Sequence, residues 1–239
     1  MYEPPVITIE GKQLKAVDNF KYLGSIISNN ASLDAEITAR IAKATAAFGR
    51  LTKRLWTNTG IRLNTKVAVY KAAVLTTLLY GCETWTLTKK QIRRLEKFHQ
   101  TTLRRIAHIK WFHKVTNYEV LSRCNISSLQ SMVDRARLRW TGHVVRMKND
   151  RIPKALLYGR LTTGLPKRGN HNTYLNNVKS TLRECDIGCI HLEELASERN
   201  NWRATVKAGI ARAEEDRIER LIQKRMRRKA RAGLSQLPT

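Results

Sequence analysis

An apolar stripe near the N-terminus constrains the fold more than any other feature of this sequence. Its members follow one another at alternating spacings of four and three residues, which places them on one face of an α-helix. They are Ile37, Ile41, Ala44, Phe48, Leu51 and Leu55. Ser32 precedes the stripe as a suitable N-cap, and Asp34 and Glu36 stand in the first turn, where the helix dipole favours acids. The sequence therefore predicts an amphipathic helix that begins at Ser32 and buries this stripe.

Basic residues occupy the flanks and back of the same predicted helix. Residues 37–82 contain eight Lys or Arg and no Asp or Glu, whereas a solvated helix surface normally mixes both signs. The whole chain shares this bias, with 45 Lys+Arg against 19 Asp+Glu and a formal net charge of +26. An excess of this size repels itself unless an anionic partner, either nucleic acid or an anionic membrane, neutralises it. Cations on rigid helix faces favour nucleic acid.

Start and stop signals predict further helices. The second helix is capped by Asn64 and ends at Gly81, and the third begins with the capping box Thr88–Gln91 and continues towards Trp111. A fourth, short helix begins with the capping box at Thr116–Glu119. A fifth helix begins near Ser127 or Ser128 and reaches Met147, and two more cover about 174–185 and 192–231.

Residues 6–28 instead alternate in the manner of two or three short antiparallel strands, including Leu14–Val17. The predicted fold class is therefore mainly α, a helical bundle preceded by a small antiparallel β-hairpin. Pro, Gly and Asn accumulate between Leu161 and Asn172, which indicates a basic loop at a boundary. We expect four segments: the hairpin at 1–30, a helical bundle at 31–115, a basic helical segment at 116–160 and a C-terminal loop with helices at 161–239.

The sequence lacks the residue patterns of the common catalytic and cofactor sites. Its six Asp are never adjacent, and no Gly-rich phosphate loop or G-x-S-x-G elbow occurs, so we predict no catalytic residues and no cofactor. Cys185, Cys189 and His191 form a weak candidate for zinc, but ordinary reduced thiols are the favoured interpretation. Four tryptophans at helical spacing are expected to pack in the core rather than stack on bases; they are Trp85, Trp111, Trp140 and Trp202.

Contact with nucleic acid is assigned to basic residues on the predicted helix faces, because Arg and Lys there can donate to phosphates. The candidates are Arg40, Lys43, Arg50, Lys53 and Arg54 on the first helix, Arg93, Arg94, Arg104 and Arg105 on the third, and Arg135, Arg137, Arg139 and Arg146 on the fifth. The run Lys224–Arg231 has three open interpretations: an RNA or DNA arm, a nuclear localisation signal, or a solvated helix end.

Several segments carry a resemblance to a known family. They are Phe20–Ser25, Glu36–Ile41 with Ala46–Phe48, Leu78–Trp85, Phe98–His99 with Leu103–Arg104, and Leu138–Met147 with Arg151–Pro153. In this order they resemble the reverse transcriptases of LINE-type non-LTR retrotransposons, most closely the endonuclease-reverse transcriptases of the RTE kind. Lys167–Tyr174 departs from the family's Arg-rich loop followed by Trp, and Ala196–Arg203 resembles the family again.

The resemblance implies that the chain is the thumb and post-thumb part of a longer polyprotein. In the family, the strand matched by Phe20, Tyr22, Leu23 and Gly24 follows the Asp-Asp motif of the palm and lies near the primer 3′ end. The palm, the endonuclease domain and the Mg²⁺ they use would belong to the parent enzyme. The fragment is expected to grip template-primer duplex and element RNA, and not to polymerise by itself.

A rival hypothesis is a decayed or domesticated element copy that serves as a protein-interaction or RNA-binding module. The expected location is intracellular, with the nucleus as the destination if the Lys224–Arg231 run is a localisation signal. No membrane is expected as a partner, since the longest uncharged apolar stretch, Ala72–Cys82, is about half of the roughly 20 residues that a membrane span needs.

Overall fold

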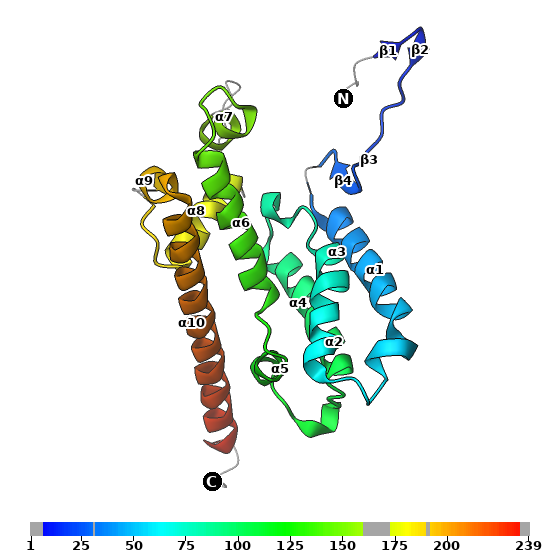
Figure 1. The fold of residues 1–239 in the computed structure, drawn as a ribbon, viewed down its shortest axis with the longest axis vertical. Coiled ribbons are helices and arrows are strands. Elements are labelled where there is room, and N and C mark those ends of the chain that lie inside the picture. Colours follow the sequence, from blue (N-terminus) through cyan, green and yellow to red (C-terminus); the bar gives the residue numbers. More distant parts are fainter. Residues whose placement is uncertain (1–6, 31, 160–172, 190–191, 235–239) are drawn as a thin grey trace.

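A computed structural model of the chain describes residues 7–30, 32–159, 173–189 and 192–234 (Figure 1). The fold is mainly helical, and small antiparallel strand pairs precede the helices, so the predicted fold class is confirmed. The predicted boundary loop Leu161–Asn172 lies outside the described residues. None of the described helices combines the length and apolarity that crossing a membrane requires.

Four short strands form two hairpins. They are β1 (Thr8–Ile9), β2 (Lys12–Gln13), β3 (Asn19–Tyr22) and β4 (Ser25–Ser28), and the pairs are β1 with β2 and β3 with β4. Leu23 and Gly24 connect β3 to β4 with φ values of 46° and 83°. A two-residue turn with positive φ at both positions matches the twist of a hairpin, and the glycine adopts it without steric cost. The predicted strand at Leu14–Val17 is not formed.

The helices of the first half pack around a shared core. They are α1 (Asp34–Arg50), α2 (Leu63–Val69), α3 (Thr76–Leu78), α4 (Lys89–Ile106) and α5 (Asn117–Arg123). Helix α1 continues into a π-helical turn at Thr52–Trp56, and a second π-helical stretch, Tyr70–Leu75, joins α2 to α3. The predicted stop at Gly81 is slightly late: α3 ends at Leu78 with Leu79 as its C-cap, and Gly81, with a φ of 76°, stands two residues further on. The predicted N-cap Asn64 is off by two residues, since α2 begins at Leu63 and its N-cap is Arg62.

Side-chain caps place three helix starts as predicted. The hydroxyl oxygens of Thr88, Thr116 and Ser128 each accept a hydrogen bond from the backbone N–H three residues later, at 3.4, 3.4 and 3.3 Å. The predicted continuation of α4 towards Trp111 is wrong. The helix ends at Ile106, the backbone turns at His108 with a φ of 53°, and Trp111 begins a separate 3₁₀ turn, Trp111–His113.

The second half contains α6 (Leu129–Val145), α7 (Ile152–Tyr158), α8 (Tyr174–Glu184), α9 (Leu192–Ser197) and α10 (Arg199–Leu234). Helix α7 was not predicted. The predicted helix 192–231 is divided at Glu198, whose carboxylate accepts hydrogen bonds from the N–H groups of Asn200 at 3.1 Å and Asn201 at 2.7 Å. This carboxylate satisfies donors at the start of α10 and so begins a new helix.

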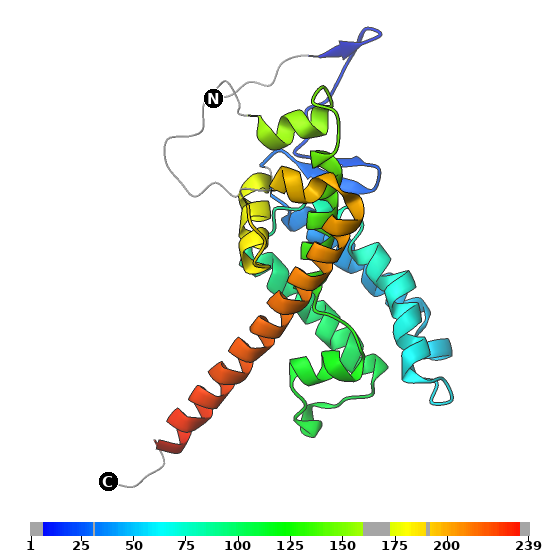
Figure 2. The same ribbon diagram turned by 60° about the vertical axis from the view of Figure 1, so that its left-hand side comes forward.

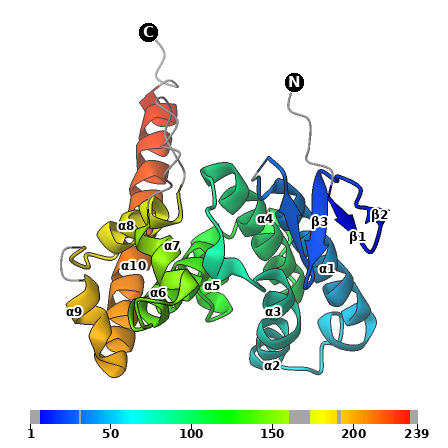
Figure 3. The same ribbon diagram turned by 90° about the horizontal axis from the view of Figure 1, so that it is seen from above.

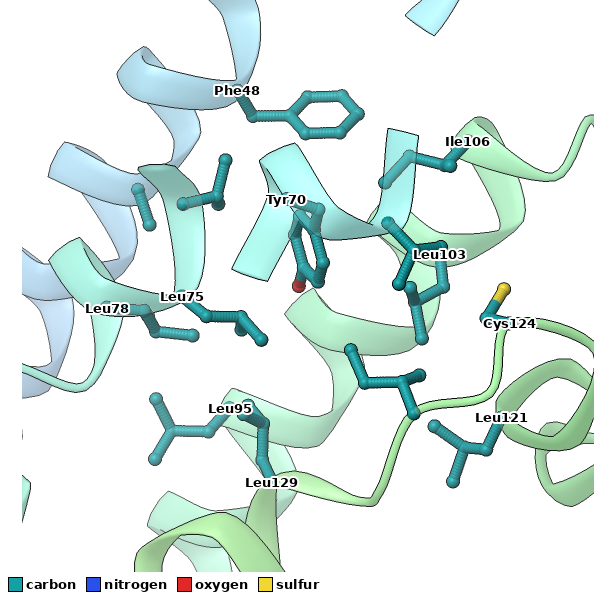
Figure 4. Packing of buried hydrophobic residues seen from close by; sticks show 14 of the residues in the cluster. Phe48, Tyr70, Leu75, Leu78, Leu95, Leu103, Ile106, Leu121, Cys124 and Leu129 are labelled. Carbon is teal, nitrogen blue, oxygen red and sulfur yellow. The ribbon is translucent and has the colours of Figure 1, made fainter. Parts of the chain in front are cut away.

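Two hydrophobic clusters form the core, and α6 contributes to both. The first extends from Ile37 to Val133 and contains the predicted stripe residues Ile37, Ala44 and Phe48. Figure 4 shows part of this cluster, with Phe48 packed near Tyr70. The second extends from Leu138 to Ala213 and is centred on Trp202. Because the clusters meet along one helix, α6 holds the two halves of the chain together.

A buried polar network lies inside the first cluster. His99 is fully buried; its Nδ1 lies 2.9 Å from the Tyr70 hydroxyl, and its Nε2 lies 3.2 Å from the Ser127 carbonyl oxygen. Since a carbonyl only accepts, Nε2 carries the proton and Nδ1 accepts from Tyr70. Burial lowers the pKa of His99 to about 4, so the ring is neutral at physiological pH.

The two halves of the chain lie side by side. The hairpins and α1–α3 lie on one side, α8–α10 lie on the other, and α5 and α6 lie between them (Figure 3). The last turns of α10 extend beyond the other helices (Figure 2).

Candidate nucleic-acid interface

Two of the predicted contact residues on α1 hold the second hairpin instead. Arg40 is 4% exposed, and its Nε donates to the Glu36 carboxylate at 2.6 Å while another nitrogen donates to the Ser25 hydroxyl at 2.8 Å. Its guanidinium also lies 4.7 Å from the centre of the Tyr80 ring. Lys43 is half-buried and donates to the Gly24 carbonyl at 2.9 Å. The prediction that Arg40 contacts phosphate is therefore corrected, because its donors face the protein interior.

Arg137 requires the same correction. It is 3% exposed and donates to Asp134 at 3.1 Å, to the Thr181 hydroxyl at 2.8 Å and to the Trp85 carbonyl at 3.2 Å. Asp134 also accepts from Arg217 of α10 at 2.9 Å. Burial raises the pKa of Asp134, while a hydrogen bond from Gln130 and the two guanidinium groups act in the opposite direction. These residues join α6 to α8, α10 and the turn before α4.

Three further candidates are half-buried and partly engaged. Arg94 donates to Asp34 at 3.3 Å and to the Thr38 hydroxyl at 2.7 Å. Arg104 donates to the Val115 carbonyl at 2.9 Å, and Arg146 donates to the Ala196 carbonyl at 2.6 Å. An arginine has five N–H donors, so each of these side chains keeps donors for another partner.

The remaining seven candidates are exposed, and none of them forms an ion pair with another described residue. They are Arg50, Lys53, Arg54, Arg93, Arg105, Arg135 and Arg139. The first three gather where α1 passes into its π-helical turn, and exposed Arg62 at the start of α2 follows in the chain. We call Arg50, Lys53, Arg54 and Arg62 the α1 basic end. No acid occurs in residues 37–82, so this cluster has no local counter-charge.

The last turns of α10 form a second exposed cluster, which we call the α10 basic tail. Its members are Lys224, Arg225, Arg227, Arg228, Lys229 and Arg231. All six are exposed, and none forms an ion pair with an acid among the described residues. Hydrogen bonds from Thr116 lower the pKa of Glu119 of α5, and the charge of Arg225 acts in the same direction. Three pairs at i,i+4 carry like charges, and each such pair destabilises a helix by roughly 0.2–0.5 kcal/mol. Both the α1 basic end and this tail lie away from the hairpins along the long axis (Figure 1), but the end of α10 and the far end of α1 are on opposite sides of the molecule (Figure 3).

The second hairpin presents an uncovered apolar face. Phe20 pairs with Ile27 and Tyr22 with Ser25 across the strands, so Phe20, Tyr22 and Ile27 share one side of the sheet. These three side chains are 57%, 58% and 57% exposed. Leu23 and Gly24 form the tip, which Lys43 fixes to α1. The residues predicted to be primer-proximal are therefore accessible and rigidly attached to the helix beneath them.

A groove between α6 and α10 collects arginines that sequence reasoning did not connect. It has a volume of about 500 Å³, and its described lining residues are Glu83, Ala136, Arg139, Trp140, His143, Arg146, Arg199, Trp202 and Arg203. Arg199 and Arg203 were not among the candidates, because they are far from Arg139 in the sequence although all three line the same groove in the fold. The sequence offered one indication: Arg199 and Arg203 are four residues apart, which puts them on the same face of a helix.

Corrections also apply to the tryptophans. Trp85 and Trp202 are 3% and 1% exposed, as predicted for core residues, but Trp111 is 90% exposed. It lies in the turn after α4 with Phe112, whose ring centre is 5.9 Å away. Trp140 is half-buried and lines the groove between α6 and α10.

The weak zinc candidate is not assembled by the described residues. Cys185 is buried, and burial raises the pKa of its thiol to about 11. Cys189 is half-buried, and His191 lies outside the described residues. Within the described chain, no three His, Cys, Asp or Glu side chains group as metal ligands would.

Comparison with known proteins points to mobile elements. The chain is 30% identical over 145 residues to a transposon-derived protein of Caenorhabditis elegans, covering 58% of this chain and 50% of that protein. It is 22% identical over 166 residues to a Drosophila melanogaster protein named as an RNA-directed DNA polymerase from the transposon X-element, covering 69% of this chain and 18% of that protein. No protein-family description and no solved structure matches the chain.

The chain thus spans about half the length of the first relative and a smaller part of the second. These similarities support an origin related to retrotransposons, and the second relative is itself named as a reverse transcriptase.

Proposed function

We propose that this chain is a nucleic-acid-binding segment of a LINE-type retrotransposon reverse transcriptase, of the RTE kind, that grips the template-primer duplex and element RNA. The observation that carries the proposal is the pair of exposed cationic clusters, the α1 basic end and the α10 basic tail, whose members form no ion pair with another described residue. Arginine and lysine on helix faces contact phosphates of any sequence, as a thumb must do.

The electrostatics of the α10 basic tail favour a polyanionic partner. Its like-charge pairs at i,i+4 oppose helix formation in the free protein, and phosphates lying between them would remove that repulsion. The tail is also solvent-exposed along all of its described side chains, so an elongated polymer can reach several cations at once. Binding should therefore raise the stability of these last turns.

The uncovered hairpin face supports the assignment to a polymerase. A two-stranded hairpin is marginal in water on its own, and Phe20, Tyr22 and Ile27 offer an apolar surface on which further strands could pack. In the family that the sequence resembles, this hairpin is the end of the palm, and the rest of the palm would pack here. Carboxylates that hold Mg²⁺ would come from that palm, so the isolated chain is expected to give no product in a Mg²⁺-dependent primer-extension assay.

The proposal is tested by measuring how binding depends on salt. Fluorescence anisotropy with an RNA–DNA hybrid duplex gives the association constant at a series of salt concentrations. If about six phosphates are neutralised, the logarithm of this constant should fall against the logarithm of salt with a slope near −5, or near −4 for a single strand. Weak binding with a flat salt response would refute the proposal.

Charge reversal locates the contact. The double variant Arg50→Glu/Arg54→Glu should weaken binding to all sequences about equally and reduce the slope by about 2, since each phosphate contact contributes about 1. The matched control is Lys179→Glu/Arg183→Glu, which changes the net charge equally, has the same i,i+4 spacing and lies exposed on α8. Equal losses in both variants would mean that net charge, and not the α1 basic end, drives binding.

A further inference from the structure

The groove between α6 and α10 concentrates positive charge in a way that packing does not require. Arg139 enters from α6, and Arg199 and Arg203 enter from the first turns of α10. All three are exposed, and none donates a hydrogen bond to or pairs with another described residue. Half-buried Glu83 is the one acid among the described lining residues. Such a cluster of like charges favours an anionic ligand.

The walls of the groove are held rigidly. Trp202 Nε1 donates to the Leu138 carbonyl at 2.9 Å, and the Trp202 ring lies directly against Gly142, where a Cβ would overlap it. Arg146 donates to the Ala196 carbonyl at 2.6 Å and thereby ties α6 to the end of α9. The arginines therefore stand on two helices whose separation is fixed by direct packing.

An aromatic surface lies beside the cations. Trp140 is half-buried and lines the groove, and its ring centre lies 5.4 Å from that of His143 with a tilt of 46°. Unpaired bases stack on aromatic rings and on guanidinium planes, and such stacking occurs with every base. The arginines can therefore bind a phosphate, and the half-buried Trp140 ring beside them can stack on the attached base.

The size of the groove selects among nucleic acids. A volume of about 500 Å³ lies within the range of pockets that hold small molecules, whereas a duplex is far wider. We propose that the groove binds a nucleoside phosphate of an unpaired strand, with the phosphate held by Arg139 and Arg203 and the base stacked on Trp140. This inference rests on the proposed function and adds a single-strand site distinct from the α1 basic end.

The test uses the full chain and a short, unstructured, uridine-rich RNA labelled with fluorescein. The double variant Arg139→Gln/Arg203→Gln should weaken binding of this single strand roughly tenfold or more and flatten its salt slope by about 1.4, which is two contacts at about 0.7 each. The matched control, Lys179→Gln/Lys207→Gln, removes two exposed charges from α8 and α10 that lie outside the groove lining and are not candidate contacts, and it should have a smaller effect. Equal effects of the two doubles, or no effect of either, would overturn the inference.

Stacking is tested separately. Trp140→Ala should weaken single-strand binding roughly tenfold, whereas Trp140→Phe should retain most of it, because both rings offer a stacking face. Thermal unfolding of each variant checks that the α6–α10 packing is intact. If Trp140→Ala leaves binding unchanged while its melting temperature is unaltered, the base does not lie on this ring and the inference fails.

Two further measurements identify the ligand. The groove double should leave binding of the hybrid duplex nearly unchanged, while Arg50→Glu/Arg54→Glu should reduce it; an equal loss of duplex binding would overturn the single-strand assignment. Uridine monophosphate and inorganic phosphate should compete only at concentrations far above that of the RNA. Competition near the RNA concentration would assign the groove to a free nucleotide or phosphate. If the groove variants fail but the α1 variants behave as expected, the proposed function stands and this inference does not.

Discussion

Replacing Arg40 by Ala should damage the fold rather than a binding surface. The change leaves the Glu36 carboxylate 2% exposed and without its guanidinium partner at 2.6 Å, although the Ile26 N–H still donates to it at 2.6 Å. Breaking a buried ion pair by removing one partner costs about 3–5 kcal/mol, and the remaining hydrogen bond favours the lower end of that range. We therefore expect a loss of about 3 kcal/mol in the free energy of unfolding.

This loss should be large enough to measure by thermal unfolding. In a chain of this size, 1 kcal/mol shifts the melting temperature by about 2–4 °C, so Arg40→Ala should lower it by about 6–12 °C. Arg50→Ala on the same helix is the control; since Arg50 is exposed, it should change stability by no more than about 0.5 kcal/mol. The Ile26 amide should also exchange faster with solvent in Arg40→Ala, because its acceptor is destabilised.

A double variant separates the ion pair from the other contacts of Arg40. Glu36→Gln/Arg40→Leu removes both charges and keeps an acceptor for the Ile26 N–H, so it should recover a substantial part of the lost stability. The reasoning is refuted if Arg40→Ala costs less than about 1 kcal/mol and weakens nucleic-acid binding as strongly as Arg50→Ala does. Arg40 would then be a contact residue, as the sequence alone suggested.

Two other predictions concern the core. The pKa of His99 is about 4 in the folded state and ordinarily 6.5, so between these pH values only the unfolded state binds the extra proton. The free energy of unfolding should therefore fall by up to about 3 kcal/mol as the pH is lowered from 6.5 to 4. Burial raises the pKa values of Asp134 and Glu96, and this makes stability rise, not fall, as the pH is lowered. The effect of His99 is therefore measured as the difference in the free energy of unfolding between the native chain and His99→Gln, taken from urea-unfolding curves at several pH values. A difference that does not change with pH would exclude the contribution of His99. Gly142→Ala would place a methyl group where the Trp202 ring lies. We expect the free energy of unfolding to fall by about 1–3 kcal/mol and the near-ultraviolet circular dichroism spectrum to change. Unaltered stability would show that α6 and α10 are not in close contact here.

Ion-pair partners were visible in the sequence but carried no information on burial. Glu36 and Arg40 are four residues apart, and Asp134 and Arg137 are three apart, which are spacings that bring side chains together on a helix. On a solvated face such pairs contribute little and leave the arginine available to a phosphate. Only the hairpin that covers Arg40 and the helices that cover Arg137 turned these pairs into interior contacts.

The sequence by itself determined the helix starts at Thr88, Thr116 and Ser128, the mainly helical class and the cationic character of α1, since each depends on residues within a few positions of one another. The predicted caps Ser32 and Asn64 were wrong, because α1 and α2 follow Leu33 and Arg62. Thr88 and Thr116 find their backbone donors three residues away whatever the rest of the chain does. Tertiary structure alone decided which arginines remain exposed, where Trp111 lies, and that Arg139 meets Arg203 in one groove. These outcomes depend on which helices and strands pack together. Such contacts join segments far apart in the sequence, so the spacing of neighbouring residues does not reveal them.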